Sequence, residues 1–261
     1  MIKHLITSGC SFSDNCGKRW PHYLAEALGA ELYNRGQGSC GNDWISKSAI
    51  YEVQRLLDAG IDPKEMLVVV MWSGIDRKGL FISNTETPNY KTLINSNSPN
   101  PVNFIDGPIN TNLSSNQYDG YLSGSMNCTF NADIVKLKKE LIRNFFNDEA
   151  LAIESYENFL RLQWFCKSNN IQLINQTFMD IMHYPRYING PLTKDHYRNI
   201  KPLNNMLDYD RWVFWKNTGG LYEYVRDNSL GFYTDNVHPL PESHKHYVDN
   251  FLLQAVRNRI S

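Results

Sequence analysis

No apolar run in this sequence approaches the roughly 20 residues that a membrane-spanning helix needs. The first apolar stretch, residues 2–6, is too short for the apolar region of a signal peptide, and no small-residue cleavage site comes after it. We therefore expect a cytoplasmic protein without a membrane segment.

An excess of either charge is also missing, because 26 Lys and Arg residues face 27 Asp and Glu residues and the net charge is −1. No global field would attract nucleic acid or an anionic membrane surface. We expect neither as a partner, and the oligomeric state is left open.

Paired cysteine motifs are absent. The chain has 5 cysteines, an odd number, and no two of them form a C-x-x-C pair. This excludes the common zinc and redox motifs and suits free thiols in a reducing compartment. We expect no metal and no cofactor.

What the sequence does have is an alternation of strand and helix signals over residues 1–76. The apolar run Met66–Trp72 is typical of a parallel strand buried on both faces. The β-α-β-α-β order predicts an α/β fold with a doubly wound sheet. The predicted strands are His4–Thr7, Glu31–Tyr33 and Met66–Trp72, and the predicted helices are Trp20–Leu28 and one that Asn42 or Asp43 caps.

Two irregular segments, at about residues 78–131 and 179–232, interrupt this alternation. We interpret them as insertions in a single domain spanning residues 1–261. The first is expected to be either a lid or substrate wall over the sheet's carboxyl edge, or a surface excursion. The remaining expected elements are helices near 134–146, 151–167 and 241–259 and a strand at 171–175. The inner face of the last helix is expected to hold Tyr247, Phe251, Leu252 and Ala255.

Ser11 comes directly after the first predicted strand and the turn that Gly9 permits. Ligands bind beyond the carboxyl ends of strands in open α/β sheets, so the position suits a nucleophile. The same segment is also compatible with a turn that only caps the next element, and Ser8 and Ser13 are rival hydroxyls.

Asp235 and His238 lie three residues apart, directly before the last predicted helix. This spacing lets a carboxylate fold back onto an imidazole and orient it as a base, which a serine nucleophile requires. A surface histidine at a helix start is the alternative.

A glycine-rich loop, Gly36–Asn42, offers backbone N–H groups that could stabilise the oxyanion of acyl transfer. Such a loop can instead cradle a phosphate at a helix N-terminus. A flavodoxin-like nucleotide-binding protein would use this loop to bind phosphate, but Asp235 and His238 would then have no role.

Together these segments resemble the SGNH, or GDSL-type, hydrolases, in a divergent form with a Gly-Cys-Ser-Phe first block. The resemblance implies a three-layer α/β/α flavodoxin-like fold, with Ser11 as nucleophile, His238 as base and Asp235 as its partner. It also implies an oxyanion hole built from the Ser11 and Gly38 N–H groups, with Gly41 as the second choice of glycine.

The third block of the family departs from its usual pattern. Ile75 stands where an asparagine normally donates to the oxyanion, and an alkyl group cannot donate. Ser73, the Gly74 backbone or Asn42 could substitute. Losing one such donor typically costs about 10²–10³ in rate. Cys10 replaces the usual aspartate beside the nucleophile, and we expect its thiol to pack inward.

Three further features have less specific interpretations. His244 and His246 invite a metal interpretation, but residues two apart on a helix do not face each other, so a solvated helix face is favoured. Asp76 and Arg77 could form an ion pair or contact an acidic substrate. The aromatic residues between Tyr184 and Trp215 could stack on sugar rings, or form the small core of the insertion.

The sequence therefore predicts a serine esterase that hydrolyses carboxylic esters through a Ser-His-Asp acyl-enzyme mechanism. Acetyl groups on a carbohydrate are the leading substrate, and a small ester is the general class. The alternative is a non-catalytic module that binds a glycan or a protein on the same scaffold.

Overall fold

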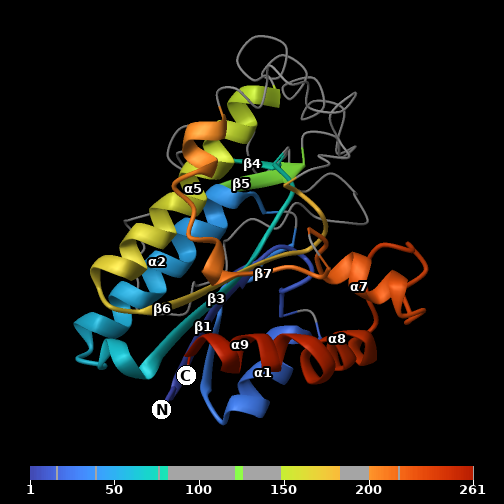
Figure 1. Cartoon of the computed structure of the whole chain (residues 1–261), viewed down its shortest axis with the longest axis horizontal. Helices are drawn as coiled ribbons and strands as arrows, with labels where there is room; N and C mark the ends of the chain where they lie inside the picture. Colours follow the sequence, from blue (N-terminus) through green and yellow to red (C-terminus); the bar gives the residue numbers. More distant parts are fainter. Residues whose placement is uncertain are drawn as a thin grey trace, which may run out of the picture.

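A five-stranded parallel β-sheet forms the centre of the fold (Figure 1). The computed structural model describes residues 1–15, 17–38, 40–75, 77–81, 121–125, 148–182, 200–216 and 218–260. The strand order is β2-β1-β3-β6-β7, which is compatible with a flavodoxin-like fold. The strands are β1 (His4–Gly9), β2 (Glu31–Asn34), β3 (Met66–Trp72), β6 (Gln172–Thr177) and β7 (Trp212–Val213). Four of the five were predicted and are confirmed with small shifts at their ends.

The register brings the carboxyl ends of the central strands to one edge of the sheet. Gly9 pairs with Met71, and Trp72 pairs with Thr177. The residues that come after β1, β3 and β6 therefore meet at this edge, where open α/β sheets bind their ligands.

Helices cover both faces of the sheet, α2 and α5 on one side and α1, α8 and α9 on the other (Figure 1). Helix α1 ends as predicted, because Gly29 adopts the left-handed conformation with φ 63°. None of the helices in the described part of the chain is both long enough and apolar enough to cross a membrane. The helices are α1 (Trp20–Leu28), α2 (Asn42–Asp58), α5 (Asp148–Ser168), α7 (Leu221–Asp227), α8 (Pro241–Tyr247) and α9 (Leu253–Ile260), with short turns η1 (Pro63–Glu65), η2 (Tyr209–Arg211) and η3 (Val248–Leu252).

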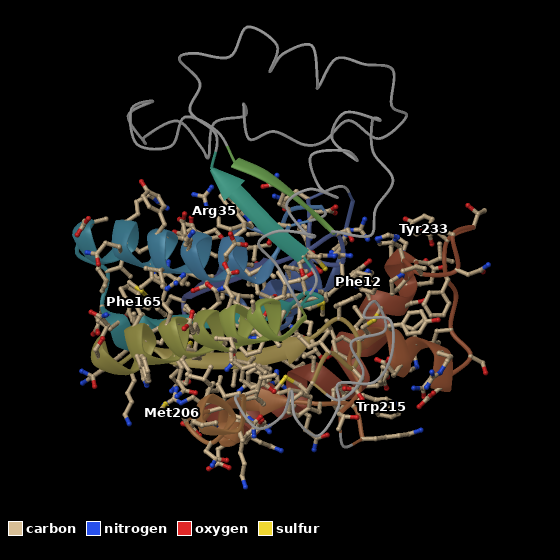
Figure 2. The ribbon with its side chains drawn as sticks, turned by 90° about the horizontal axis from the view of Figure 1, so that it is seen from above. Phe12, Arg35, Phe165, Met206, Trp215 and Tyr233 are labelled. Atoms are coloured by element: carbon tan, nitrogen blue, oxygen red, sulfur yellow. The ribbon has the colours of Figure 1, made fainter. Side chains whose placement is uncertain are left out.

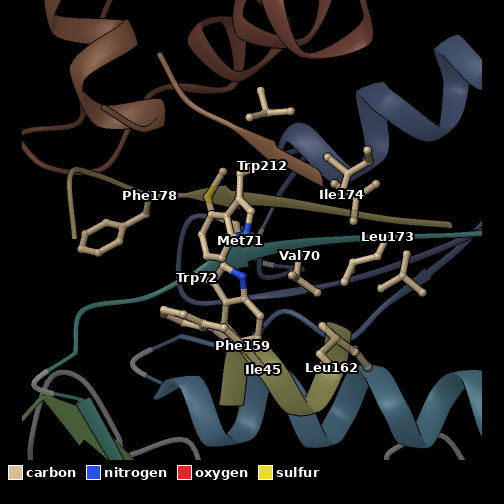
Figure 3. Close-up of a cluster of buried hydrophobic side chains, with 14 of the residues drawn as sticks. Ile45, Val70, Met71, Trp72, Phe159, Leu162, Leu173, Ile174, Phe178 and Trp212 are labelled. Atoms are coloured by element: carbon tan, nitrogen blue, oxygen red, sulfur yellow. The ribbon is translucent and has the colours of Figure 1, made fainter. Parts of the chain in front are cut away.

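Aromatic rings fill the layer between β3 and α5 (Figure 3). Every residue of β3 is buried, as expected for a central parallel strand. The Trp72 ring lies 4.6 Å from the Phe159 ring, which in turn meets Trp212 edge-on at 5.3 Å. Such pairs add roughly 0.5–1.5 kcal/mol each beyond the burial of their area.

The first predicted insertion contains regular structure at its ends. Strand β4 (Arg77–Phe81) pairs antiparallel with β5 (Tyr121–Ser125), and Arg77 lies opposite Ser125. The intervening residues 82–120 and the predicted helix at 134–146 lie outside the described residues.

The second predicted insertion, at about residues 179–232, contains regular elements, which corrects the prediction that this whole segment is irregular. Trp212 and Val213 form β7, which extends the main sheet beside β6, and α7 comes after it. A two-residue strand is too short to show any periodicity, so no pattern in the sequence could have predicted it. Trp212 belongs to the core rather than to a sugar-binding surface, since it is 2% exposed. Tyr184 and the other aromatic residues of 183–199 lie outside the described residues.

The final helix runs over the predicted range but contains a π-helical turn, η3, between α8 and α9. Tyr247 and Leu252 are buried as predicted, and Phe251 and Ala255 pack partly buried against the core. The Tyr247 hydroxyl donates to Gln176 Oε1 at 2.8 Å, which ties this helix to β6.

Candidate active site

Ser11 stands on a tight turn directly after β1. The Ser13 N–H donates to the Cys10 carbonyl at 2.8 Å and closes the turn. A β-carbon at Gly9 would lie 2.2 Å from Ser13 Oγ, so only glycine fits the start of the turn. Cys10 and Phe12 are fully buried, as predicted for Cys10, whereas Ser11 is only half-buried.

The structure distinguishes the three rival hydroxyls. Ser8 Oγ lies 2.9 Å from Ser48 Oγ, and Ser13 Oγ accepts from Trp20 Nε1 at 2.9 Å. Both serines are fully buried. Ser11 Oγ instead lies 2.8 Å from His238 Nε2, so Ser11 alone of the three meets the candidate base.

Asp235 and His238 are held together by a short hairpin before α8. Asp235 Oδ2 lies 2.5 Å from His238 Nδ1, and Oδ1 accepts from the Val237 and His238 N–H groups, both at 2.9 Å. The Tyr233 N–H donates to the His238 carbonyl at 2.8 Å and closes the hairpin. Figure 2 shows Tyr233 and Phe12 at the same end of the molecule.

The electrostatics of this pair favour a carboxylate. Partial burial of Asp235 opposes ionisation, but hydrogen bonds from the His238 backbone and ring and from the Val237 N–H outweigh it and lower the pKa of Asp235. A charged Asp235 keeps the proton of a neutral His238 on Nδ1, which leaves Nε2 free to accept from the Ser11 hydroxyl. The Phe12 ring lies 5.2 Å from the His238 ring and supports it from one side.

The glycine loop lies beside the Ser11 turn. The Gln37 N–H donates to the Gly9 carbonyl at 2.9 Å, which ties the loop to the end of β1. Asn34 also joins the two: its Oδ1 accepts from the Gly36 N–H at 2.9 Å, and its Nδ2 donates to the Ser13 carbonyl at 2.7 Å. Sequence reasoning assigned Asn34 no such contacts, although a polar residue at the end of a strand, two positions before a glycine, was the available signal.

The N–H groups of Ser11 and Gly38 have no hydrogen-bond acceptor in the described part of the chain. Gly38 is half-buried, so part of this residue is in contact with solvent. These two donors are therefore available to bind a developing negative charge.

The side-chain amide of Asn42 is hydrogen-bonded inside the protein, so the geometry does not support the expectation that it donates to an oxyanion. Asn42 is 1% exposed, and its Nδ2 donates to the Ser73 carbonyl at 3.1 Å and to Ser155 Oγ at 3.2 Å. Its Oδ1 accepts from the Ser73 N–H at 2.8 Å. Neither Asn42 nor Asp43 caps α2 either, because Gly41 is the capping residue and no side chain contributes.

The other residues considered for the oxyanion hole are also buried. Ser73 is fully buried, and Ile75 is 4% exposed, so neither side chain presents a donor to solvent. Gly41 is buried, and a β-carbon there would lie 2.5 Å from the Arg77 carbonyl, so its glycine serves packing.

The loop also carries a spacing that sequence reasoning missed. Gly36, Gly38 and Gly41 match G-x-G-x-x-G between β2 and α2, the context of dinucleotide loops. Here Gly36 packs on protein, since a β-carbon would lie 2.2 Å from the Ser13 carbonyl. The first turn of α2 carries the buried acid Asp43, which would repel a phosphate. The geometry therefore disfavours a nucleotide at this loop.

His244 contradicts the expected solvated helix face. Its ring is fully buried, and neither nitrogen has a hydrogen-bond partner among the described residues. Burial, with smaller contributions from Arg19 and His238, lowers its pKa to about 3, so the ring is neutral. Within the described ranges no three His, Cys, Asp or Glu side chains group closely enough to hold a metal.

A family model described as a family of unknown function (DUF6071) matches residues 11–118 of this chain. The match includes Ser11 and the glycine loop and ends before Asp235 and His238. No curated protein sequence matches the chain.

Proposed function

We propose that this protein is a serine esterase of SGNH type that hydrolyses carboxylic esters. The observation that carries the proposal is the hydrogen-bonded series from Ser11 Oγ to His238 Nε2, at 2.8 Å, and from His238 Nδ1 to Asp235, at 2.5 Å. The order of these residues and the parallel sheet beneath them are compatible with the SGNH arrangement.

In this mechanism Ser11 Oγ attacks the ester carbonyl while His238 Nε2 takes its proton. Asp235 stabilises the imidazolium that forms. The Ser11 and Gly38 N–H groups bind the oxyanion. The C–O bond to the alcohol then breaks as His238 returns the proton to the leaving oxygen. Water, activated by His238, clears the acyl group from Ser11.

The altered third block makes us expect a weaker oxyanion hole than three donors would give. Neither Asn42 nor Ser73 replaces the missing amide, because the Asn42 side chain is hydrogen-bonded inside the protein and Ser73 is buried. The preference for acetylated carbohydrate depends on insertions that lie largely outside the described residues, so it stays a prediction. The three described cysteines are free and buried, which supports the expected cytoplasmic location.

The proposal is tested with a fluorophosphonate probe, which labels activated serines. Wild type is expected to be labelled and Ser11→Ala is not, whereas Ser8→Ala keeps its label. Failure to label wild type, or equal labelling of Ser11→Ala, would overturn the catalytic assignment. The missing third donor favours the rival function, a non-catalytic glycan- or protein-binding module, and that outcome would support it.

A further inference from the structure

Asn34, the last residue of β2, connects the turn that carries Ser11 with the loop that carries Gly38. Its Nδ2 donates to the Ser13 carbonyl at 2.7 Å, at the end of the turn, and its Oδ1 accepts from the Gly36 N–H at 2.9 Å, at the start of the loop. The two candidate oxyanion donors, the Ser11 and Gly38 N–H groups, lie on these two segments. One side chain therefore holds both segments that the proposed oxyanion hole requires.

The Asn34 amide uses all of its hydrogen-bonding capacity. Its Oδ1 also accepts from Thr7 Oγ1 at 2.9 Å, and its Nδ2 also donates to Asn15 Oδ1 at 2.8 Å. A carboxamide offers two acceptor sites and two donors, so all four are occupied. Because a peptide N–H can only donate and a carbonyl can only accept, the amide fits between Gly36 and Ser13 in one orientation. The position therefore needs a side chain that accepts through one atom and donates through another.

The loop and the turn are in direct contact where this amide joins them. A β-carbon at Gly36 would lie 2.2 Å from the Ser13 carbonyl oxygen, so the loop packs on the turn itself. A second contact lies further along the loop, where the Gln37 N–H donates to the Gly9 carbonyl at 2.9 Å. Gln37 directly precedes the loop donor, and Gly9 lies two residues before the candidate nucleophile. These short contacts fix the loop against the turn.

We infer that Asn34 is the positioning residue of the oxyanion hole, because it holds the Ser11 and Gly38 N–H groups in the arrangement that binds the tetrahedral intermediate. This inference rests on the proposed function. Ile75 offers no side-chain donor in the third block, so the proposed hole depends on the placement of these two backbone donors. A misplacement of about 1 Å can cost about 10² in rate. All four hydrogen bonds of the Asn34 amide go to protein groups, so it acts through the two segments rather than on the substrate.

The test measures how tightly each variant binds trifluoroacetone, whose ketone forms a tetrahedral adduct with an activated serine. Ser11 Oγ bonds to the carbonyl carbon, the electron pair of the carbonyl π bond moves to the oxygen, and His238 keeps the serine proton. The adduct carries its oxyanion where the transition state does, so its Ki reports on the oxyanion hole. Asn34→Ala is expected to raise this Ki by about 10–100-fold and to lower kcat/KM for p-nitrophenyl acetate by the same factor.

Two further variants separate positioning from folding. Gly36→Ala pushes the loop away from the Ser13 carbonyl while Asn34 is kept, so it should raise the Ki as well. Asn158→Ala removes a buried asparagine whose hydrogen bonds stay within α5, and it should leave the Ki unchanged. Fluorophosphonate titration counts the active molecules of each variant. A purely structural role would lower that count and the melting temperature but not change the Ki, which does not depend on the amount of active protein.

An unchanged Ki in an active Asn34→Ala variant, or an equal change in Asn158→Ala, would overturn the inference and leave the esterase proposal standing. If Asn34→Ala yields no labelled protein, Gly36→Ala decides by the same criterion. If wild type neither hydrolyses an ester nor is labelled, the inference and the proposed function are both wrong.

Discussion

Asp235 uses its two oxygens for two different tasks. Oδ1 accepts two backbone N–H groups and shapes the hairpin, whereas Oδ2 faces the His238 ring. An asparagine at this position can keep its one oxygen as the acceptor for the backbone, and its uncharged NH2 group then faces the ring in place of the carboxylate oxygen. The substitution therefore separates the fold of the hairpin from its electrostatics.

We expect Asp235→Asn to lower kcat by about 10²–10⁴ with little change in the melting temperature, because the neutral amide no longer stabilises the imidazolium. Ester hydrolysis and thermal unfolding measure the two effects. Asp249→Asn, which removes an exposed acid paired with Lys245, is the control and should not alter kcat. A kcat within twofold of wild type in Asp235→Asn would contradict this role.

The three side chains of the candidate triad could be predicted from the sequence, because each lies in a short motif that can be recognised from neighbouring residues alone. The role of Asn42 could not. Its partner Ser155 lies 113 positions away, and no local pattern shows that this amide is consumed by the packing of α2 on α5. The burial of His244 could not be predicted for the same reason, since it depends on the elements that pack over α8.

Among the elements, β2 and α2 are joined by a buried carboxylate between two arginines. Glu52 on α2 is fully buried and accepts from Arg35 Nε at 2.7 Å and from Arg55 Nε at 3.0 Å. Arg35 comes directly after β2, so this cluster fixes the start of the glycine loop relative to the helix. Removing one member of a buried pair leaves charges without compensation.

Glu52→Gln is expected to lower the free energy of unfolding by about 1.5–3 kcal/mol, the range of a hydrogen bond to a charged group, because both guanidinium groups lose their counter-charge. The matched control is Glu65→Gln, which breaks the Lys3–Glu65 pair of 2.6 Å, whose side chains are 60% and 31% exposed. That change should cost less than about 1 kcal/mol. Urea unfolding of the two variants checks the difference, and equal losses would contradict it.

Elements with a long, uniform pattern were predicted well, and elements defined by their neighbours were not. The apolar run of β3 and the proline and glycine at the ends of α1 act locally. In contrast, β7 is a strand only because β6 lies beside it, and β4 and β5 pair across residues that lie outside the described part of the chain.

The stability of the folded chain as a whole depends on pH through the buried His244. Its pKa in the folded state is lowered from 6.5 to about 3. The unfolded chain therefore takes up a proton as the pH falls below about 6.5, while the folded protein does not until about pH 3. The contribution to stability is complete above pH 6.5 and is lost progressively toward pH 3.

His244→Leu is accordingly expected to lose less stability than wild type between pH 7 and pH 5, by about 2 kcal/mol. Unfolding in urea at the two pH values measures this. His246→Gln serves as the control, because that ring is only half-buried and its Nδ1 lies 2.9 Å from the Tyr224 hydroxyl. Parallel pH profiles for wild type and His244→Leu would refute the expectation.

Ser11 and His238 are separated by 227 positions along the chain. A ribosome adding about 5–20 residues per second needs roughly 10–45 s to travel from the one codon to the other. Throughout that interval the growing polypeptide carries Ser11 as an ordinary hydroxyl, with no base to activate it. A chain cut short before residue 235 stays in that condition permanently, so the proposed chemistry would begin only after Asp235 and His238 have been synthesised and the helix that follows them has packed against the sheet.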